Sequence, residues 1–160
     1  MRVGIGYDIH ALQKGRRLIL GGVEIPFSKS LVGHFDGDAL VHAIVDAILG
    51  AMGEGDIGEH FSDKDSRNKN ANSLVFVEKA KALLKKNKFK ILNIDSVVIA
   101  EAPKLSAYKL PMRKKIASVF NISLDSVSVK AKTNEGFGPL GKNQAIACTA
   151  VVALKNGRNS

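Results

Sequence analysis

Two short patterns near the start of the chain combine histidine with aspartate at spacings that suit a metal site. Asp8 and His10 lie two residues apart in a stretch expected to form a strand, so both side chains point to the same side. His42 offers a third ligand. Two histidines and one carboxylate with an open fourth position are typical of catalytic zinc. The residues therefore predict a zinc ion bound by Asp8, His10 and His42. The alternative is that both histidines are hydrogen-bonded polar groups of the core.

The segment that carries His42 predicts a buried helix over residues 38–52. Its side chains are apolar on nearly all sides, and the polar ones, Asp38, His42 and Asp46, are spaced by four. Residues at that spacing lie on one face of a helix, and a helix that is apolar all round is buried. Charges in such a place need partners or a metal. We therefore expect Asp38 or Asp46 to orient His42 through a hydrogen bond.

The elements that must position these residues follow from periodicity and turn residues. We expect an α/β (α+β) fold, a single domain over residues 1–160 with one sheet and helices packed on it. It includes a mobile loop over 62–72 and a disordered tail over 156–160. The expected strands cover 2–12, 89–100, 126–133 and 145–154, with a hairpin through Gly21 and Gly22, and the expected helices cover 38–52, 73–87 and 109–120.

The last expected strand, residues 145–154, is apolar without alternation. Strands of this kind are normally covered on both faces. Because three helices can cover only one face of the sheet, we expect either a second subunit on the other face or a small β-sandwich within the chain.

The composition narrows the class of protein. With 45% hydrophobic and 24% charged residues it is ordinary for a globular domain. No run approaches the about 18 apolar residues of a membrane helix, the first residues lack a signal-peptide pattern, and the lone Cys148 excludes an intrachain disulfide. We expect a soluble protein of the cytoplasm.

The net charge of +9 is concentrated in residues 63–115, which hold 14 basic and 5 acidic residues. This basic segment leaves a nucleic-acid-binding module as an alternative.

Six motifs occur in order along the chain: Gly4–His10, Leu20–Pro26, His34–Ala47, Gly55–Gly58, Ala102–Lys104 and Lys130–Glu135. In residue type and spacing they resemble the 2-C-methyl-D-erythritol 2,4-cyclodiphosphate synthase family of the non-mevalonate isoprenoid pathway. The likeness covers essentially the whole chain, and the length of 160 residues matches the monofunctional form rather than the fusion with the preceding cytidylyltransferase.

The resemblance implies a homotrimer of α/β subunits whose sheets meet around the trimer axis, with active sites between neighbours. The implied activity is that of a phosphorus–oxygen lyase. It would close 4-diphosphocytidyl-2-C-methyl-D-erythritol 2-phosphate into 2-C-methyl-D-erythritol 2,4-cyclodiphosphate and release CMP. The family can also hold an isoprenoid diphosphate in the central cavity of the trimer.

The resemblance also implies roles for single residues. The three predicted zinc ligands match those of the family, and Glu135 matches the residue that holds Mg²⁺ or Mn²⁺ between the substrate phosphates. His34 and Thr133 match residues that stabilise the transition state. Residues 100–106 match the cytosine pocket, and Asp56, Gly58 and the loop Phe61–Asp65 match the part that closes on the methylerythritol. The other implied substrate contacts are Phe35, Asp56, Ile57, Gly58, Phe61, Asp63, Asp65, Ala100, Ala102, Pro103, Lys104, Ser106, Lys132, Asn134, Pro139 and Lys142.

Several positions depart from the family pattern. Phe35 stands where serine is usual, which removes a hydroxyl contact to phosphate, and Lys132 and Asn134 stand where hydroxyl residues are common. Pro139 and Lys142 occupy positions that often carry an aromatic residue and an arginine and that line the central cavity. Lysine keeps the charge of arginine but lacks its planar fork.

Two other functions stay open at this point. An unrelated zinc hydrolase would attack with a metal-bound water and would need a general base, for which Glu54 and Asp38 are the local candidates. A basic module that binds RNA would depend on Lys85, Lys86 and Lys88 rather than on zinc.

Overall fold

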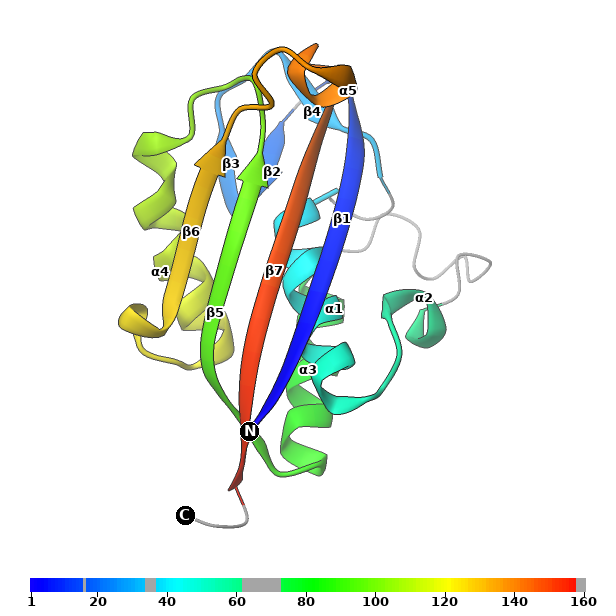
Figure 1. Ribbon diagram of the computed structural model, residues 1–160, viewed down its shortest axis with the longest axis vertical. Coiled ribbons are helices and arrows are strands. Elements are labelled where there is room, and N and C mark those ends of the chain that lie inside the picture. Colours follow the sequence, from blue (N-terminus) through cyan, green and yellow to red (C-terminus); the bar gives the residue numbers. More distant parts are fainter. Residues whose placement is uncertain (16, 34–36, 62–72, 158–160) are drawn as a thin grey trace.

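A computed structural model describes residues 1–15, 17–33, 37–61 and 73–157. Five strands form one sheet in the order β4-β1-β7-β5-β6, in which only β5 and β6 run parallel and the other neighbours are antiparallel. Figure 1 shows the long strands of the sheet side by side, and the two ends of the described chain lie close together at the lower end of the sheet. The strands are β1 (Arg2–Lys14), β4 (Lys29–Leu31), β5 (Phe89–Ile99), β6 (Val127–Lys132) and β7 (Ala145–Asn156).

Three long helices pack on one face of this sheet, as the sequence predicts (Figure 1). They bury the apolar side chains of that face, and together with the sheet they form the core of the domain. The helices are α1 (Ala39–Met52), α3 (Leu74–Lys86) and α4 (Lys109–Phe120), with the short α2 (Ile57–His60), α5 (Gly138–Gly141), η2 (Ser106–Tyr108) and η3 (Leu124–Ser126) between them. None of the described helices is long and apolar enough to cross a membrane.

The predicted hairpin is present as the two-stranded sheet of β2 (Leu18–Leu20) and β3 (Val23–Ile25). Its two turn residues, Gly21 and Gly22, have φ of 58° and 70°. A two-residue hairpin turn of this kind requires positive φ at both positions, which glycine adopts without strain. The hairpin lies beside the start of α1, where its turn contacts Asp38.

The opposite face of the large sheet is open over much of its area in this single chain. On β1 the side chains that point away from the helices are Val3, Ile5, Tyr7 and Ile9, which are 45–70% exposed, and Val151 on β7 is 39% exposed. No second sheet formed by the described residues covers them. The β-sandwich interpretation of strand 145–154 is therefore wrong, and an apolar face remains available to another subunit.

The boundaries differ from the predicted ones by a few residues. Strand β7 continues through Asn156, which takes in the first residue of the expected tail, and Gly157 donates its backbone N–H to the Lys88 carbonyl at 2.6 Å. The strand extends because its last residues still pair with the start of β5. Residues 158–160 and the expected loop over 62–72 lie outside the described residues.

Candidate metal centre and substrate pocket

The predicted ligands Asp8, His10 and His42 converge on one point between β1 and α1. Asp8 Oδ2 lies 2.7 Å from His10 Nε2 and 3.0 Å from His42 Nδ1, and the two ring nitrogens are 3.3 Å apart. Among the described residues these three form a group whose ligand atoms could hold a metal ion. The prediction that these side chains meet is confirmed.

The distances within the group fit a tetrahedral metal. Ligand atoms about 2.0–2.1 Å from a tetrahedral zinc lie about 3.3 Å from one another. Of the three distances in the structure, that between the two ring nitrogens, 3.3 Å, equals this value, and the two from Asp8, 2.7 and 3.0 Å, are shorter. Two imidazole nitrogens and one carboxylate oxygen are also the donor types that zinc prefers, with a fourth position left for a substrate oxygen.

Close packing of α1 against β1 brings His42 to the two ligands on the strand. Gly4 and Gly6 face the helix, and a Cβ atom on either would lie only 2.0 Å from a backbone carbonyl oxygen, that of Ala47 or of Ala43. Any other residue at these positions would push the helix away. The glycines of the first motif therefore set the distance across which the metal ligands meet.

His10 is held by the backbone of the segment that follows β4. Its Nδ1–H donates to the Val32 carbonyl at 2.8 Å, because a carbonyl can only accept, and this leaves Nε2 as the nitrogen that faces Asp8. The ring also lies against Gly33, where a Cβ atom would come within 2.6 Å of His10 Cε1. Both contacts fix the ring with its free nitrogen toward the metal position.

His42 is the most buried of the three ligands, with 8% of its surface exposed. Its Nδ1 faces Asp8, and its Nε2 lies 2.9 Å from Ser73 Oγ. The ring also meets Phe76 edge to face at a centroid distance of 5.2 Å. The sequence-based prediction missed Ser73, because a serine just before a helix is typical of a helix N-cap.

The electrostatics of the cluster couple the carboxylate to the imidazoles. Burial by itself raises the pKa of Asp8, but hydrogen bonds and charge interactions with His10 and His42 outweigh it and hold that pKa well below its usual range. Burial lowers the pKa of His10, and the hydrogen bond and charge of Asp8 outweigh it, so the pKa is raised. Asp8 is therefore ionised at neutral pH, as a metal ligand must be.

The carboxylates of Asp38 and Asp46 accept hydrogen bonds from backbone N–H groups. Asp38 caps α1 by accepting from Val41 N, and it also accepts from the N–H groups of Gly21 and Gly22 at 2.9 and 2.6 Å. Asp46 accepts from Ile57 N at 2.9 Å, and burial raises its pKa. In the structure, Ser73 occupies the position behind His42 that we expected an aspartate to take.

A second group of predicted residues gathers after the ends of β5 and β6. Thr133 Oγ1 donates to Glu135 Oε1 at 2.8 Å. Glu135 has a φ of 51°, which is uncommon for a residue with a Cβ. A lone carboxylate in a turn is a suitable ligand for Mg²⁺, which is often held by one carboxylate and substrate phosphates.

Beside this turn lies a pocket of about 230 Å³. The Ala102–Pro103 peptide bond in its wall is cis. Glu101, which accepts from Asn134 N at 3.3 Å, is one of the lining residues that the resemblance did not single out. The pocket is lined by Ala100, Glu101, Pro103, Lys104, Leu105, Ser106, Lys109, Ala131, Lys132 and Thr133.

The other predicted contacts that the structure describes lie on α2 or directly beside it, and on or directly after α5. Asp56 caps α2 by accepting from Glu59 N at 3.0 Å, which places Ile57 and Gly58 in the first turn of that helix. Phe61 packs on Phe76, with ring centroids 4.8 Å apart. Pro139 lies in α5, and Lys142 follows directly after it. The predicted residues His34, Phe35, Asp63 and Asp65 lie outside the described residues.

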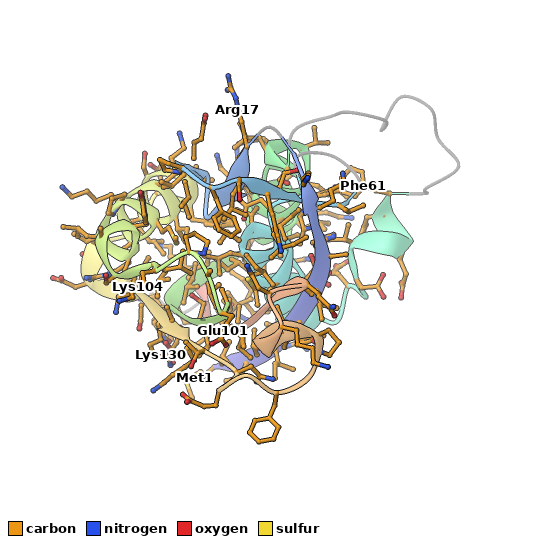
Figure 2. All side chains as sticks on the ribbon, turned by 90° about the horizontal axis from the view of Figure 1, so that it is seen from above. Met1, Arg17, Phe61, Glu101, Lys104 and Lys130 are labelled. Carbon is orange, nitrogen blue, oxygen red and sulfur yellow. The ribbon has the colours of Figure 1, made fainter. Side chains whose placement is uncertain are left out.

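The metal ligands and the pocket lie at the same end of the sheet but on different strands. Through the pairing register, Asp8 on β1 stands level with Ala131 on β6, and β7 and β5 lie between them. Three strand spacings correspond to about 14 Å. Figure 2, seen from above, shows Phe61, which follows α2, on one side of the molecule and the pocket residue Lys104 on the other.

Comparison with known proteins shows which family the sequence belongs to. The YgbB family matches residues 1–155. A 2-C-methyl-D-erythritol 2,4-cyclodiphosphate synthase of Syntrophomonas wolfei is 50% identical over 155 residues, which are 97% of this chain and 99% of that protein. The bifunctional enzyme IspD/IspF of Albidiferax ferrireducens is 52% identical over 154 residues, 96% of this chain and 37% of its own length.

Solved structures of similar fold carry names from the same family. The IspF of Plasmodium falciparum in a CDP complex is 39% identical, with a TM-score of 0.85 over 97% of this chain and 96% of that one. The bifunctional IspDF of Campylobacter jejuni is 39% identical, with a TM-score of 0.93 over 97% of this chain and 42% of that one. By sequence motifs, fold and similarity over nearly its full length, this chain belongs to the YgbB family, that of the 2-C-methyl-D-erythritol 2,4-cyclodiphosphate synthases.

Proposed function

We propose that this chain is itself a 2-C-methyl-D-erythritol 2,4-cyclodiphosphate synthase. It would convert 4-diphosphocytidyl-2-C-methyl-D-erythritol 2-phosphate into the cyclic diphosphate and CMP. The observation that carries the proposal is the convergence of Asp8, His10 and His42 at 2.7–3.3 Å in a chain about 50% identical to proteins of that name. The cytoplasm is part of the proposal, because such a charged nucleotide substrate does not cross membranes unaided.

The reaction requires little covalent chemistry from the protein. An oxygen of the 2-phosphate attacks the β-phosphorus, a new P–O bond forms, and the bond to the α-phosphate oxygen breaks, so that CMP leaves with the electron pair. Because the nucleophile is already an anionic phosphate oxygen, positioning and charge neutralisation are the main tasks. Zinc held by Asp8, His10 and His42, together with Mg²⁺ or Mn²⁺ held through Glu135, would supply the charge that makes the β-phosphorus electrophilic.

The pocket beside β6 supports a nucleotide subsite. Its walls combine the backbone of residues 100–106 with Lys104 and Lys132, which offer peptide groups to a base edge and positive charge to phosphates. Thr133 and Glu135, joined by their hydrogen bond, stand next to it. We assign transition-state stabilisation to Thr133 and His34, and contacts to the methylerythritol to Asp56, Gly58 and the residues that follow α2.

We further propose that the working unit is a homotrimer with sites shared between neighbours. The exposed apolar face of β1 and β7 supports a subunit contact, since a patch of this kind marks an interface. The three strand spacings, about 14 Å, between Asp8 and Ala131 in one chain also favour a site completed by the pocket of a neighbour. In such a trimer, Lys142 after α5 would be the cation available to an isoprenoid diphosphate in a central cavity.

The direct test is to incubate the purified protein with the cytidyl substrate and to follow the phosphorus products by ³¹P NMR. We expect CMP and a cyclic diphosphate, and we expect a chelator to abolish both. An open-chain bisphosphate in place of the ring would instead identify a zinc hydrolase, and no turnover at all would refute the proposal.

Two variants test the assigned roles and the sharing of sites. His42→Ala should lose zinc and CMP release, whereas Glu135→Gln should keep zinc and lose the response to Mg²⁺. Mixing the two inactive variants under conditions of subunit exchange should restore part of the activity, because some mixed trimers would contain an intact site. Metal analysis that finds full zinc in His42→Ala would contradict the ligand assignment, and no recovery on mixing would contradict the shared site.

A further inference from the structure

The first turn of α3 contacts the metal ligand His42 at two points. Ser73 Oγ lies 2.9 Å from His42 Nε2, and the Phe76 ring meets the imidazole edge to face at 5.2 Å. Residues three apart lie on the same face of a helix. Both contacts are buried, since Ser73 and Phe76 are each 2% exposed.

Ser73 stands where a helix N-cap is expected but does not act as one. A capping serine has extended backbone angles and accepts a hydrogen bond from the N–H of the second or third helical residue. Ser73 has helical angles, φ −53° and ψ −15°, and its side chain makes no capping hydrogen bond. Its carbonyl begins the helix by accepting from Phe76 N, while its hydroxyl is directed to His42.

We propose that Ser73 is a positioning residue of the metal centre, and this inference rests on the proposed function of Asp8, His10 and His42 as metal ligands. Ser73 holds the His42 imidazole with Nε2–H donating to Oγ, which leaves Nδ1 unprotonated and directed at the metal position. The partner of a ligating histidine fixes both its tautomer and its ring orientation. The second contact, from the Phe76 ring, is apolar and limits only the tilt of the imidazole.

The two histidine ligands are held in different ways. His10 donates from Nδ1 to the Val32 carbonyl, an acceptor that allows only one tautomer. His42 instead has its Nε2 against a side-chain hydroxyl, that of Ser73, at 2.9 Å.

The test compares Ser73→Ala with Ser73→Thr, which keeps the hydroxyl. Ser96→Ala is the matched control, since Ser96 is also buried at 1% exposure and donates to the Ser128 carbonyl at 3.0 Å on β5 and β6. Zinc affinity is measured by competition with a chromophoric chelator, and ligand geometry by the visible spectrum of the Co²⁺ form. Neither measurement needs substrate.

We expect Ser73→Ala to bind zinc roughly 10- to 100-fold more weakly and to shift the Co²⁺ bands, with Ser73→Thr close to the wild type. Ser96→Ala should leave both unchanged. Wild-type zinc affinity and Co²⁺ bands in Ser73→Ala would overturn the inference, and so would an equal loss of affinity in Ser96→Ala, which would indicate general destabilisation.

If Ser73→Ala does not fold, the tautomer can be read in the zinc-loaded wild type from long-range ¹H–¹⁵N correlations of the histidines. His42 should carry its proton on Nε2 and His10 on Nδ1. A proton on Nδ1 of His42 would refute the inference. Failure of the wild type to release CMP would refute the proposed function but would leave the zinc measurements on Ser73 standing.

Discussion

The glycine at position 6 offers a sharp test of how the fold builds the metal centre. In Gly6→Ala the new Cβ would lie 2.0 Å from the Ala43 carbonyl oxygen and 2.8 Å from Ala47 N, both backbone atoms of α1. Ordinary contact begins at about 3.4 Å, so the helix must withdraw by about 1.4 Å at this point. His42 is the residue before Ala43 and moves with it.

The size of this displacement decides the outcome. Metal–ligand distances tolerate about 0.2 Å, so a ligand withdrawn by more than 1 Å is effectively lost. We expect Gly6→Ala to bind zinc at least roughly 100-fold more weakly, and to lose about 2 kcal/mol of unfolding free energy through overpacking. Zinc titration and urea denaturation of the metal-free protein measure the two effects separately.

Gly50→Ala is the matched control on the helix itself. Gly50 is exposed, and a Cβ there would have the Ile5 carbonyl oxygen as its nearest neighbour, at 3.8 Å. Alanine in a helix is favoured over glycine by about 1 kcal/mol, so this variant should be slightly more stable and bind zinc normally. Wild-type zinc affinity in Gly6→Ala would show that close packing of α1 on β1 does not set the ligand geometry.

Three further outcomes follow from the described contacts. In the metal-free protein, the lowered pKa of Asp8 stabilises the fold above about pH 4, and this stabilisation is lost as the pH falls. The raised pKa of His10 stabilises the fold below pH 6.5, and this second stabilisation is lost as the pH rises. The midpoint temperature of thermal unfolding should therefore be raised between these two pH limits, and the variant Asp8→Asn should lack this increase. Asp38→Ala should cost about 3 kcal/mol in chemical denaturation, because three backbone N–H groups lose their acceptor, and a cost below 1 kcal/mol would contradict this. Ile5→Glu on the open face should sediment near the chain mass of 17.1 kDa with its fold intact and without CMP release, and a particle of three times that mass would refute the proposed contact.

The metal ligands could be predicted because they lie at the regular spacings of a strand and of a helix. Alternation on a strand unites Asp8 and His10, and a spacing of four on a helix places His42 on a polar stripe of an otherwise apolar segment. The same stripe was misleading for Asp38. An aspartate at the start of a helix is also a good N-cap, and its further partners, Gly21 and Gly22, are brought to it only by the fold.

Other features of the site have no local signal in the sequence. Ser73 looks like a capping residue, and its contact with His42 depends on how α3 packs on α1. The distance between the metal ligands and Thr133 depends on strand order, because β7, the last strand of the chain, inserts between β1 and β5. The apolar strand over 145–154 predicted a cover on both faces by either a second subunit or a β-sandwich, and the structure contradicts only the β-sandwich.

The residues of the first motif, Gly4–His10, act together because alternate residues of β1 face successive turns of α1. Two residues of a strand rise about 6.7 Å and one helical turn rises about 5.4 Å, so each alternate residue of β1 passes about one turn of α1. Gly4 meets the turn of Ala47 and Gly6 the turn of Ala43. The next position in this series, Asp8, must face the first turn of the helix, and there it meets His42. Glycines at the first two positions bring the elements together, and side chains with ligand atoms at the next two positions use the space where α1 begins.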